Sequence, residues 1–290
     1  MVVVLLLLAG LAVVAFVFLA TLISTARSRG ELRPGVESIA LGAVTDFFDT
    51  LGIGSFAPTT AWLKLRRLTP DSFIPATLNA GHALPTVAEA FVFINLVRVD
   101  PVLLAACILA AVAGAIVGAP LVVRLPVRVV QAVVGVALIV AAGLYTLTNL
   151  GLMPGGGSAL SLPMGLFAVA VAGHFAMGAL MTLGIGLYAP SLILLSLMGL
   201  NPTAAFPIMM GACAFLMPVS GLRFVRAARI DLRVVIGLAI GGIPAVLLAA
   251  LAVKSLPLGA IRWGVVAVVL YAAAILLRAA FRKAPDPAQG

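Results

Sequence analysis

Apolar residues run along almost the whole chain, in long stretches separated by short groups that hold arginine, lysine, glycine or proline. Because about 20 helical residues cross the hydrocarbon core of a bilayer, stretches of this length predict transmembrane helices. The first stretch has no basic start and is followed by Arg27 and Arg29, so we expect a retained span and not a cleaved signal peptide. The pattern predicts seven full spans, near residues 2–24, 70–97, 101–123, 127–149, 202–223, 232–253 and 258–281.

Two further apolar stretches, 36–63 and 160–198, are each interrupted near the middle by two glycines and a proline. Backbone that cannot remain helical must satisfy its hydrogen bonds away from lipid. The first stretch is too short for two spans, so we expect a re-entrant hairpin that enters and leaves the membrane on one side. The second stretch is longer and fits either a hairpin or two complete spans.

Composition agrees with this pattern, since 63% of the 290 residues are hydrophobic and only 9% are charged. Soluble domains are about half apolar and a quarter charged, so a single integral membrane domain over residues 1–290 is predicted. The net charge of +9 lies in short connections, where membrane insertion explains it, and nucleic acid is not an expected partner. Cys107 and Cys213 lie inside apolar stretches and are interpreted as small core residues.

The chain also contains an internal repeat. With a shift of 132 residues, positions 50–58 align with positions 182–190, and only the two residues after the second glycine differ. The same shift places Pro70 on Pro202 and Pro75 on Pro207. Paired interrupted segments at matching positions of two halves are a sequence indication of a transporter binding site.

The basic residues orient the two copies. If both interrupted stretches return to the side they entered, all but three of the 18 lysines and arginines fall on the cytoplasmic side, the exceptions being Arg98, Lys254 and Arg262. Three spans per copy then force the second copy to be upside down. We therefore predict an all-α polytopic membrane fold of two inverted repeats, about 3–123 and 127–253, each with a re-entrant segment broken by glycine and proline, plus a final helix 258–281.

The interrupted segments predict an anion site. Glycine permits positive φ and a close approach of backbone N–H groups to a ligand, and a helix that restarts after the turn points the positive end of its dipole at it. Such a site needs no charged side chain and suits an oxyanion such as sulfite or a sulfonate. The alternative is that these glycines only allow close helix packing. The predicted substrate-binding residues are Gly52, Gly54, Ser55, Asn79, Gly184 and Gly186.

Ionisable residues inside the apolar stretches are few, and a buried charge in a membrane needs a reason. Asp46 and Asp49 precede the first glycine turn, and His82 and Glu89 belong to a polar stripe on the next span. We predict that these four residues carry a coupling proton, with His174 as the titratable group of the second copy. Local pairing is the alternative for Asp46 and for the stripe that holds His82 and Glu89, and His174 can equally be structural.

The two segments that read Thr-Leu-Gly-Ile-Gly-x-x-Ala-Pro, in a chain of this size, resemble the TauE/SafE family of permeases, also called the sulfite exporter or TSUP family. The resemblance covers about residues 35–277. It implies a polytopic protein of the bacterial inner membrane that moves small sulfur-containing anions, such as sulfite or organosulfonates, by a secondary mechanism. Many members have further glycines after Gly-x-Gly, where this chain has Ser55-Phe56 and Leu187-Tyr188, a difference that alters the predicted pocket wall.

The sequence therefore predicts a proton-coupled secondary transporter whose partners are a small anion and membrane lipids. It contains no ATP-binding loop, no dinucleotide motif and too few histidines and cysteines for a heavy-metal ligand set, so we predict no cofactor, metal or catalytic residue. A passive anion channel stays open as an alternative, since it would keep the paired turns without needing the carboxylates. An intramembrane hydrolase, with Ser55 as nucleophile and His82 or His174 as base, is the other alternative.

Overall fold

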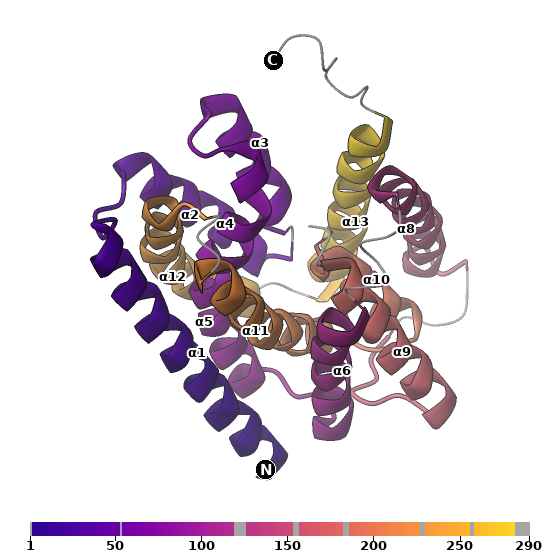
Figure 1. The fold of residues 1–290 in the computed structure, drawn as a ribbon. Helices are drawn as coiled ribbons and strands as arrows, with labels where there is room; N and C mark the ends of the chain where they lie inside the picture. Colours follow the sequence, from indigo (N-terminus) through magenta and orange to yellow (C-terminus); the bar gives the residue numbers. More distant parts are fainter. Residues whose placement is uncertain are drawn as a thin grey trace.

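The computed structural model describes residues 2–52, 54–118, 126–152, 157–181, 186–226, 230–255 and 258–281. Helices make up almost all of this part, whose one isolated β-bridge joins Ala159 and Leu200 (Figure 1). The helical elements are α1 (Val2–Arg29), α2 (Val36–Thr50), α3 (Phe56–Arg66), the 3₁₀ turn η1 (Asp71–Phe73), α4 (Ile74–Gly81), α5 (Ala83–Leu96), α6 (Pro101–Ala113), the π-helical turn η2 (Gly114–Gly118), α8 (Val127–Asn149), α9 (Met164–Met181), α10 (Tyr188–Leu197), α11 (Pro202–Arg226), α12 (Leu232–Ser255) and α13 (Leu258–Phe281).

Six helices of the described part, α1, α8, α9, α11, α12 and α13, are long and apolar enough to cross a membrane. The 18-residue α9 is the shortest of them. At 1.5 Å per residue it is about 27 Å long, close to the thickness of the hydrocarbon core. The chain is therefore an all-helical, multi-pass membrane protein, as the apolar pattern predicted. The predicted span 101–123 is not among the six, because its described part is the short α6 followed by η2, whereas α9 comes from the second interrupted stretch.

The stretch 70–97, predicted as one span, is divided in the structure. The short turn η1 is followed by α4 and α5, and the break between these two helices lies at His82. Pro85 explains the break, because its nitrogen carries no hydrogen to donate to the carbonyl of Gly81, four residues earlier. His82 consequently lies at a bend and not at a regular helical position.

The helices α2 and α3 form a hairpin that closes at its base. Glu37, in the first turn of α2, accepts hydrogen bonds from Arg66 Nε at 2.8 Å and Trp62 Nε1 at 3.1 Å, both near the end of α3. The hydrogen bond from Arg66, supported by that from Trp62, holds the pKa of Glu37 below its usual value. Both ends of the first interrupted stretch therefore lie on the same side of the fold.

The helices α9 and α10 pair in a similar way. The N–H of Asn201 donates to the carbonyl of Ala159 at 2.8 Å, so the residues before α9 meet the residues after α10. Farther into the hairpin, His174 of α9 lies within hydrogen-bond distance of Ser191 of α10. The order of these contacts makes the two helices antiparallel.

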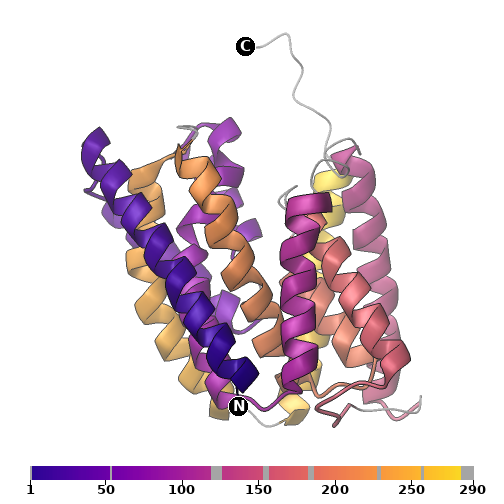
Figure 2. The same cartoon turned by 60° about the horizontal axis from the view of Figure 1, so that its bottom comes forward.

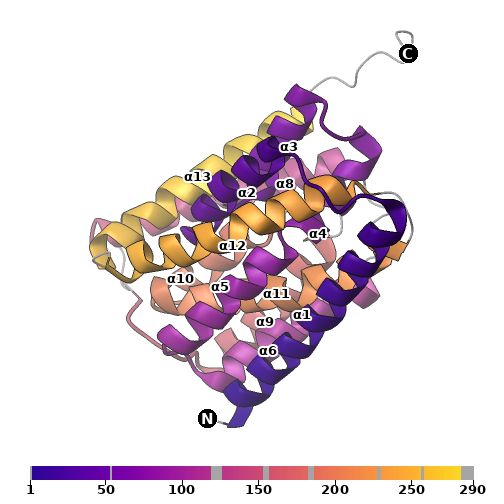
Figure 3. The same cartoon turned by 90° about the vertical axis from the view of Figure 1, so that its left-hand side faces the viewer.

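One helix of each hairpin packs along a helix from the other copy of the repeat. Helix α2 packs along α12, and α9 packs along α6. A Cβ added to Gly42 of α2 would overlap the backbone of Leu238, and one added to Gly178 of α9 would overlap the carbonyl of Ala111. Helix α11 lies between the two resulting groups, with α1, α2, α5 and α12 on one side and α6, α8, α9, α10 and α13 on the other (Figures 1 and 2). Helix α1 follows the outer edge of the bundle and packs on α11 (Figure 3).

Helices at matching positions of the repeat run antiparallel. The repeat shift carries α8 onto α13, and Gly135 in the first half of α8 lies against Leu277 in the last turns of α13. The same shift carries α4 and α5 together onto α11. Phe93 near the end of α5 stacks on Phe206 near the start of α11, with ring centroids 5.4 Å apart.

Candidate functional site

The first glycine turn joins α2 to α3 through backbone conformations that suit glycine. Gly52 and Gly54 have φ of 90° and 88°, in the left-handed region that residues with a Cβ disfavour. The N–H of Gly52 donates to the Asp49 carbonyl at 2.7 Å. Ser55 then precedes α3 as its N-cap residue. Its N–H donates to Asp49 Oδ1 at 2.8 Å, and its hydroxyl donates to Oδ2 at 3.0 Å. Both oxygens of one carboxyl group are therefore held by the turn.

A second buried group joins α2, α3 and the bend between α4 and α5. His82 Nδ1 lies 2.6 Å from Asp46 Oδ1, and His82 Nε2 lies 3.0 Å from Thr59 Oγ1. Asp46 Oδ2 has no hydrogen-bond partner among the described residues and faces Gly242 of α12, where a Cβ would overlap it. His82 can be neutral or charged in this arrangement, because the hydroxyl of Thr59 can donate to Nε2 or accept from it.

Glu89 of α5 contacts both interrupted segments. Its Oε1 lies 2.8 Å from the hydroxyl of Thr50 at the end of α2, and its Oε2 accepts a hydrogen bond of 2.5 Å from Tyr188 at the start of α10. Gly52 lies beside Leu192 of α10, since a Cβ added there would be 3.5 Å from Leu192 Cδ2. The tips of the two hairpins therefore meet around one carboxyl group.

These ionisable groups are buried together. Asp46, His82 and Glu89 have no exposed surface, and Asp49 is 4% exposed. Across the described ranges, the only basic side chain within hydrogen-bond distance of a carboxyl group of this cluster is His82. Burying a charge in a membrane is costly unless it is paired. The cluster therefore contains three carboxyl groups and one histidine, and the histidine contacts only Asp46 among the three.

The other predicted binding residues lie at or near the turns. Asn79 is buried in α4, and its Nδ2 donates to the carbonyl of Pro75 at 2.9 Å. A Cβ added to Gly54 or to Gly186 would meet no atom of the described residues within 4 Å. Gly184 lies outside the described residues.

The hydrogen bonds of His174 stay within the second hairpin. Its Nδ1 lies 2.8 Å from the carbonyl of Ala170, so Nδ1 carries the proton, and its Nε2 accepts from the hydroxyl of Ser191 at 2.9 Å. A neutral imidazole satisfies both contacts. These contacts place His174 at the pairing of α9 with α10.

Comparisons with known proteins do not identify a family for this chain. No family model, curated protein or solved structure matches this chain.

Two hydroxyl groups that sequence reasoning did not select, those of Thr50 and Tyr188, complete the site. Tyr188 stands at the position that Phe56 occupies in the first copy, so the second copy alone adds a hydroxyl there. That difference within an otherwise repeated motif is the sequence signal for Tyr188. Thr50 follows Asp46 by one helical turn, which places both residues on one face of α2.

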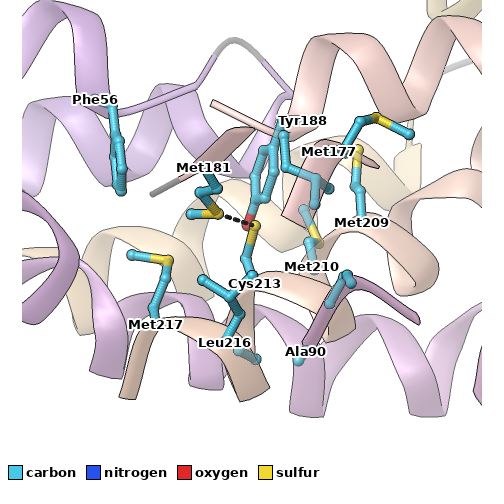
Figure 4. Packing of buried hydrophobic residues seen from close by; sticks show 14 of the residues in the cluster. Phe56, Ala90, Met177, Met181, Tyr188, Met209, Met210, Cys213, Leu216 and Met217 are labelled. Atoms are coloured by element: carbon cyan, nitrogen blue, oxygen red, sulfur yellow. Dashed lines mark hydrogen bonds between the residues drawn. The ribbon is translucent and has the colours of Figure 1, made fainter. Parts of the chain in front are cut away.

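Sulfur-containing side chains surround Tyr188 on the apolar side of the site (Figure 4). The thiol of Cys213 in α11 donates to the sulfur of Met181 at the end of α9, at 3.8 Å, directly beside the Tyr188 hydroxyl. Met210 and Met217 extend this wall along α11. Methionine side chains adapt their shape easily, and here they fill the apolar space beside Tyr188.

The serine and histidine residues of the alternative hydrolase are not hydrogen-bonded to each other. The Ser55 hydroxyl donates to Asp49, whereas His82 contacts Thr59 and His174 contacts Ser191. A serine nucleophile is activated by a base within hydrogen-bond reach. In this conformation Ser55 therefore has neither His82 nor His174 within hydrogen-bond reach.

Proposed function

We propose that the protein is a proton-coupled secondary transporter of a small sulfur-containing anion, such as sulfite or an organosulfonate, in a bacterial inner membrane. The anion binds at the first glycine turn, on the donors of Ser55, in the region where the two hairpin tips meet. The resemblance of both turns to the TauE/SafE motif supports this substrate class and this membrane.

The observation that carries the proposal is the pair of hydrogen bonds from Ser55 to the carboxyl group of Asp49. A carboxylate is an oxyanion, and the N–H and hydroxyl of Ser55 hold its two oxygens at the start of α3. A sulfite or sulfonate group offers oxygens to the same donors. The side chain of Asp49 thus occupies the position that we assign to the transported anion.

Protonation of Asp49 would couple anion binding to the proton. A protonated carboxyl group is a weaker acceptor, so the donors of Ser55 become available to an anion. A proton and an anion then occupy the site together, which lowers the charge carried through the membrane interior. By linkage, a bound anion favours protonation to the same extent. Side chains of the described residues leave room for a ligand beside Gly54 and beside Gly186.

Inverted symmetry would let one site open alternately to the two sides of the membrane. The antiparallel packing of the matching helices α8 and α13 supports this, as does the exchange of partners between the α2–α12 and α9–α6 pairs. These contacts favour a division in which α2 to α8 match α9 to α13 and α1 has no counterpart. The closed base of the first hairpin, with its two short helices, supports a re-entrant segment there. The second hairpin also has a closed base, but its α9 is long enough to cross the membrane.

Flux assays in proteoliposomes test the proposal. Uptake of labelled sulfite, sulfate, thiosulfate and small sulfonates is measured with and without an imposed pH gradient. We expect the gradient to drive uptake of a sulfur oxyanion, and we expect Ser55→Ala to weaken it. Thr45→Val is the matched control, because the Thr45 hydroxyl bonds only the Leu41 carbonyl in the same helix.

Two outcomes count against the proposal. Uptake that ignores the pH gradient would indicate a passive anion channel. Failure of the folded protein to take up any sulfur oxyanion would refute the substrate class.

A further inference from the structure

The hydroxyl group of Thr50 has two oxygen partners and only one proton. Its Oγ1 lies 2.8 Å from the carbonyl oxygen of Asp46, one turn earlier in α2, and 2.8 Å from Oε1 of Glu89. A hydroxyl donates one hydrogen bond and can accept two. A backbone carbonyl cannot donate, so Thr50 can make full hydrogen bonds to both oxygens at once only if Glu89 supplies the second proton.

We propose that Glu89 is protonated on Oε1 in this conformation and that this proton joins the two interrupted segments. Glu89 Oε1–H donates to Thr50, Thr50 donates to the Asp46 carbonyl, and the Tyr188 hydroxyl donates to Glu89 Oε2. Each proton then has one acceptor. The role of this proton as the coupling proton rests on the proposed function, whereas its presence follows from the geometry.

Loss of this proton would disturb the contact between the hairpin tips. Thr50 would have to turn its proton to Glu89, which leaves two oxygens, Thr50 Oγ1 and the Asp46 carbonyl, 2.8 Å apart with no proton between them. The new charge would also be buried among other acidic groups. The titratable groups around Glu89 are Asp46 and Asp49 of α2, Tyr188 of α10 and Cys213 of α11, with His82 at the bend as the nearby base.

The deprotonated form should therefore leave this conformation. Because Thr50 belongs to the first hairpin and Tyr188 to the second, a change at Glu89 reaches both hairpins at once. The closed contact described here is the proton-loaded state of the protein, and release of the proton allows the tips to separate.

Infrared spectroscopy of the purified protein tests the proton without any substrate. The parent protein should show the carbonyl stretch of a protonated carboxylic acid, and Glu89→Gln should remove that band. Thr50→Val and Tyr188→Phe should each shift the band, because each removes one hydrogen bond to Glu89. Thr45→Val should leave it in place, since Thr45 bonds the carbonyl of Leu41 and not Glu89.

Thermal unfolding in detergent gives an independent measurement. Glutamine has the shape of protonated glutamate, with an NH₂ group that can donate to Thr50 and an oxygen that can accept from Tyr188. The Tm of the parent should fall as the pH becomes alkaline, and the Tm of Glu89→Gln should fall less.

The assignment is overturned if the spectrum holds no carboxylic acid band that Glu89→Gln removes, or if the Tm of Glu89→Gln falls with pH as much as that of the parent. A band that behaves as expected in a protein without anion flux would remove the proposed function and leave the protonated Glu89 in place.

Discussion

The variant Asp49→Asn distinguishes two possible roles of the Asp49 carboxyl group. The group can compete with the anion for the hydrogen-bond donors of Ser55, or it can help the anion to bind. Asparagine keeps the shape of aspartate, and its oxygen can still accept from the Ser55 N–H, but its NH₂ group cannot accept from the Ser55 hydroxyl. If the carboxylate occupies the position that the anion needs, the variant frees the hydroxyl. Anion binding should then become tighter, even though an acidic residue of the site has been removed.

The size of this effect follows from one hydrogen bond to a charged group. Such a bond contributes about 1.5–3 kcal/mol, and about 1.36 kcal/mol corresponds to a tenfold change in an equilibrium constant. The anion affinity of Asp49→Asn should therefore be roughly 10- to 150-fold higher than that of the parent at alkaline pH. The gain should shrink as the pH falls, because protonation of Asp49 produces the same uncharged site in the parent.

Calorimetric titration of the purified protein with a stable sulfonate, over a series of pH values, measures this directly. Thr45→Val controls for loss of a polar group in α2, and Ser55→Ala should weaken binding in both the parent and the Asp49→Asn background. Weaker binding by Asp49→Asn at every pH would show that the carboxyl group supports the anion and would refute the competition argument.

The remaining predictions concern packing and the base of the first hairpin. Gly178→Ala places a methyl group against the carbonyl of Ala111. Such overpacking costs about 1–3 kcal/mol, so the Tm in detergent should fall. An unchanged Tm would contradict the close approach of α9 to α6. Gly143→Ala is the control, because its Cβ meets no atom of the described residues within 4 Å. The hydrogen bond between Glu37 and Trp62 is present above the usual pKa of a glutamate and should be lost as the pH falls through the lowered pKa of Glu37. Trp62 fluorescence, read in a variant without the other tryptophan, should report this transition, and Glu37→Gln should abolish it.

The multi-pass helical fold could be predicted because it depends on length and apolarity, which the sequence displays directly. The division of 70–97 at His82 could not. Pro85 is visible in the sequence, but proline is tolerated inside membrane helices when neighbouring groups satisfy the freed carbonyl. The apolar pattern therefore does not distinguish a kinked span from two helices joined at a bend.

Only some residues of the candidate site could be predicted from the sequence. The polar stripe predicted that Glu89 faces the bundle, and the glycine turns predicted donors near Ser55, because both follow from local spacing. The partner of Glu89 is Tyr188, 99 residues away, and no periodicity reports a contact over that separation. The bond from Ser55 to Asp49 depends on the path of the turn between them, which the positive φ values of its glycines determine.

The duplicated backbone carries acidic chemistry in one copy only, and packing gives the reason. The repeat shift places Glu89 on Gly221, and a Cβ at Gly221 would be 2.7 Å from Phe18 of α1. It places Asp46 on Gly178, which lies against the backbone of α6. In both cases the second copy uses the absence of a side chain to bring helices together.

A second acidic cluster would also be unnecessary for coupling. Glu89 already contacts the first hairpin through Thr50 and the second through Tyr188, so one proton can bias both interrupted segments. A matching acid on the other side would place like charges across a buried contact and raise the cost of each. Under the proposed function, one set of acids between the two hairpins would be sufficient for both to respond to a single proton. The hydroxyl that distinguishes Tyr188 from Phe56 would be the feature of the second copy that makes this possible.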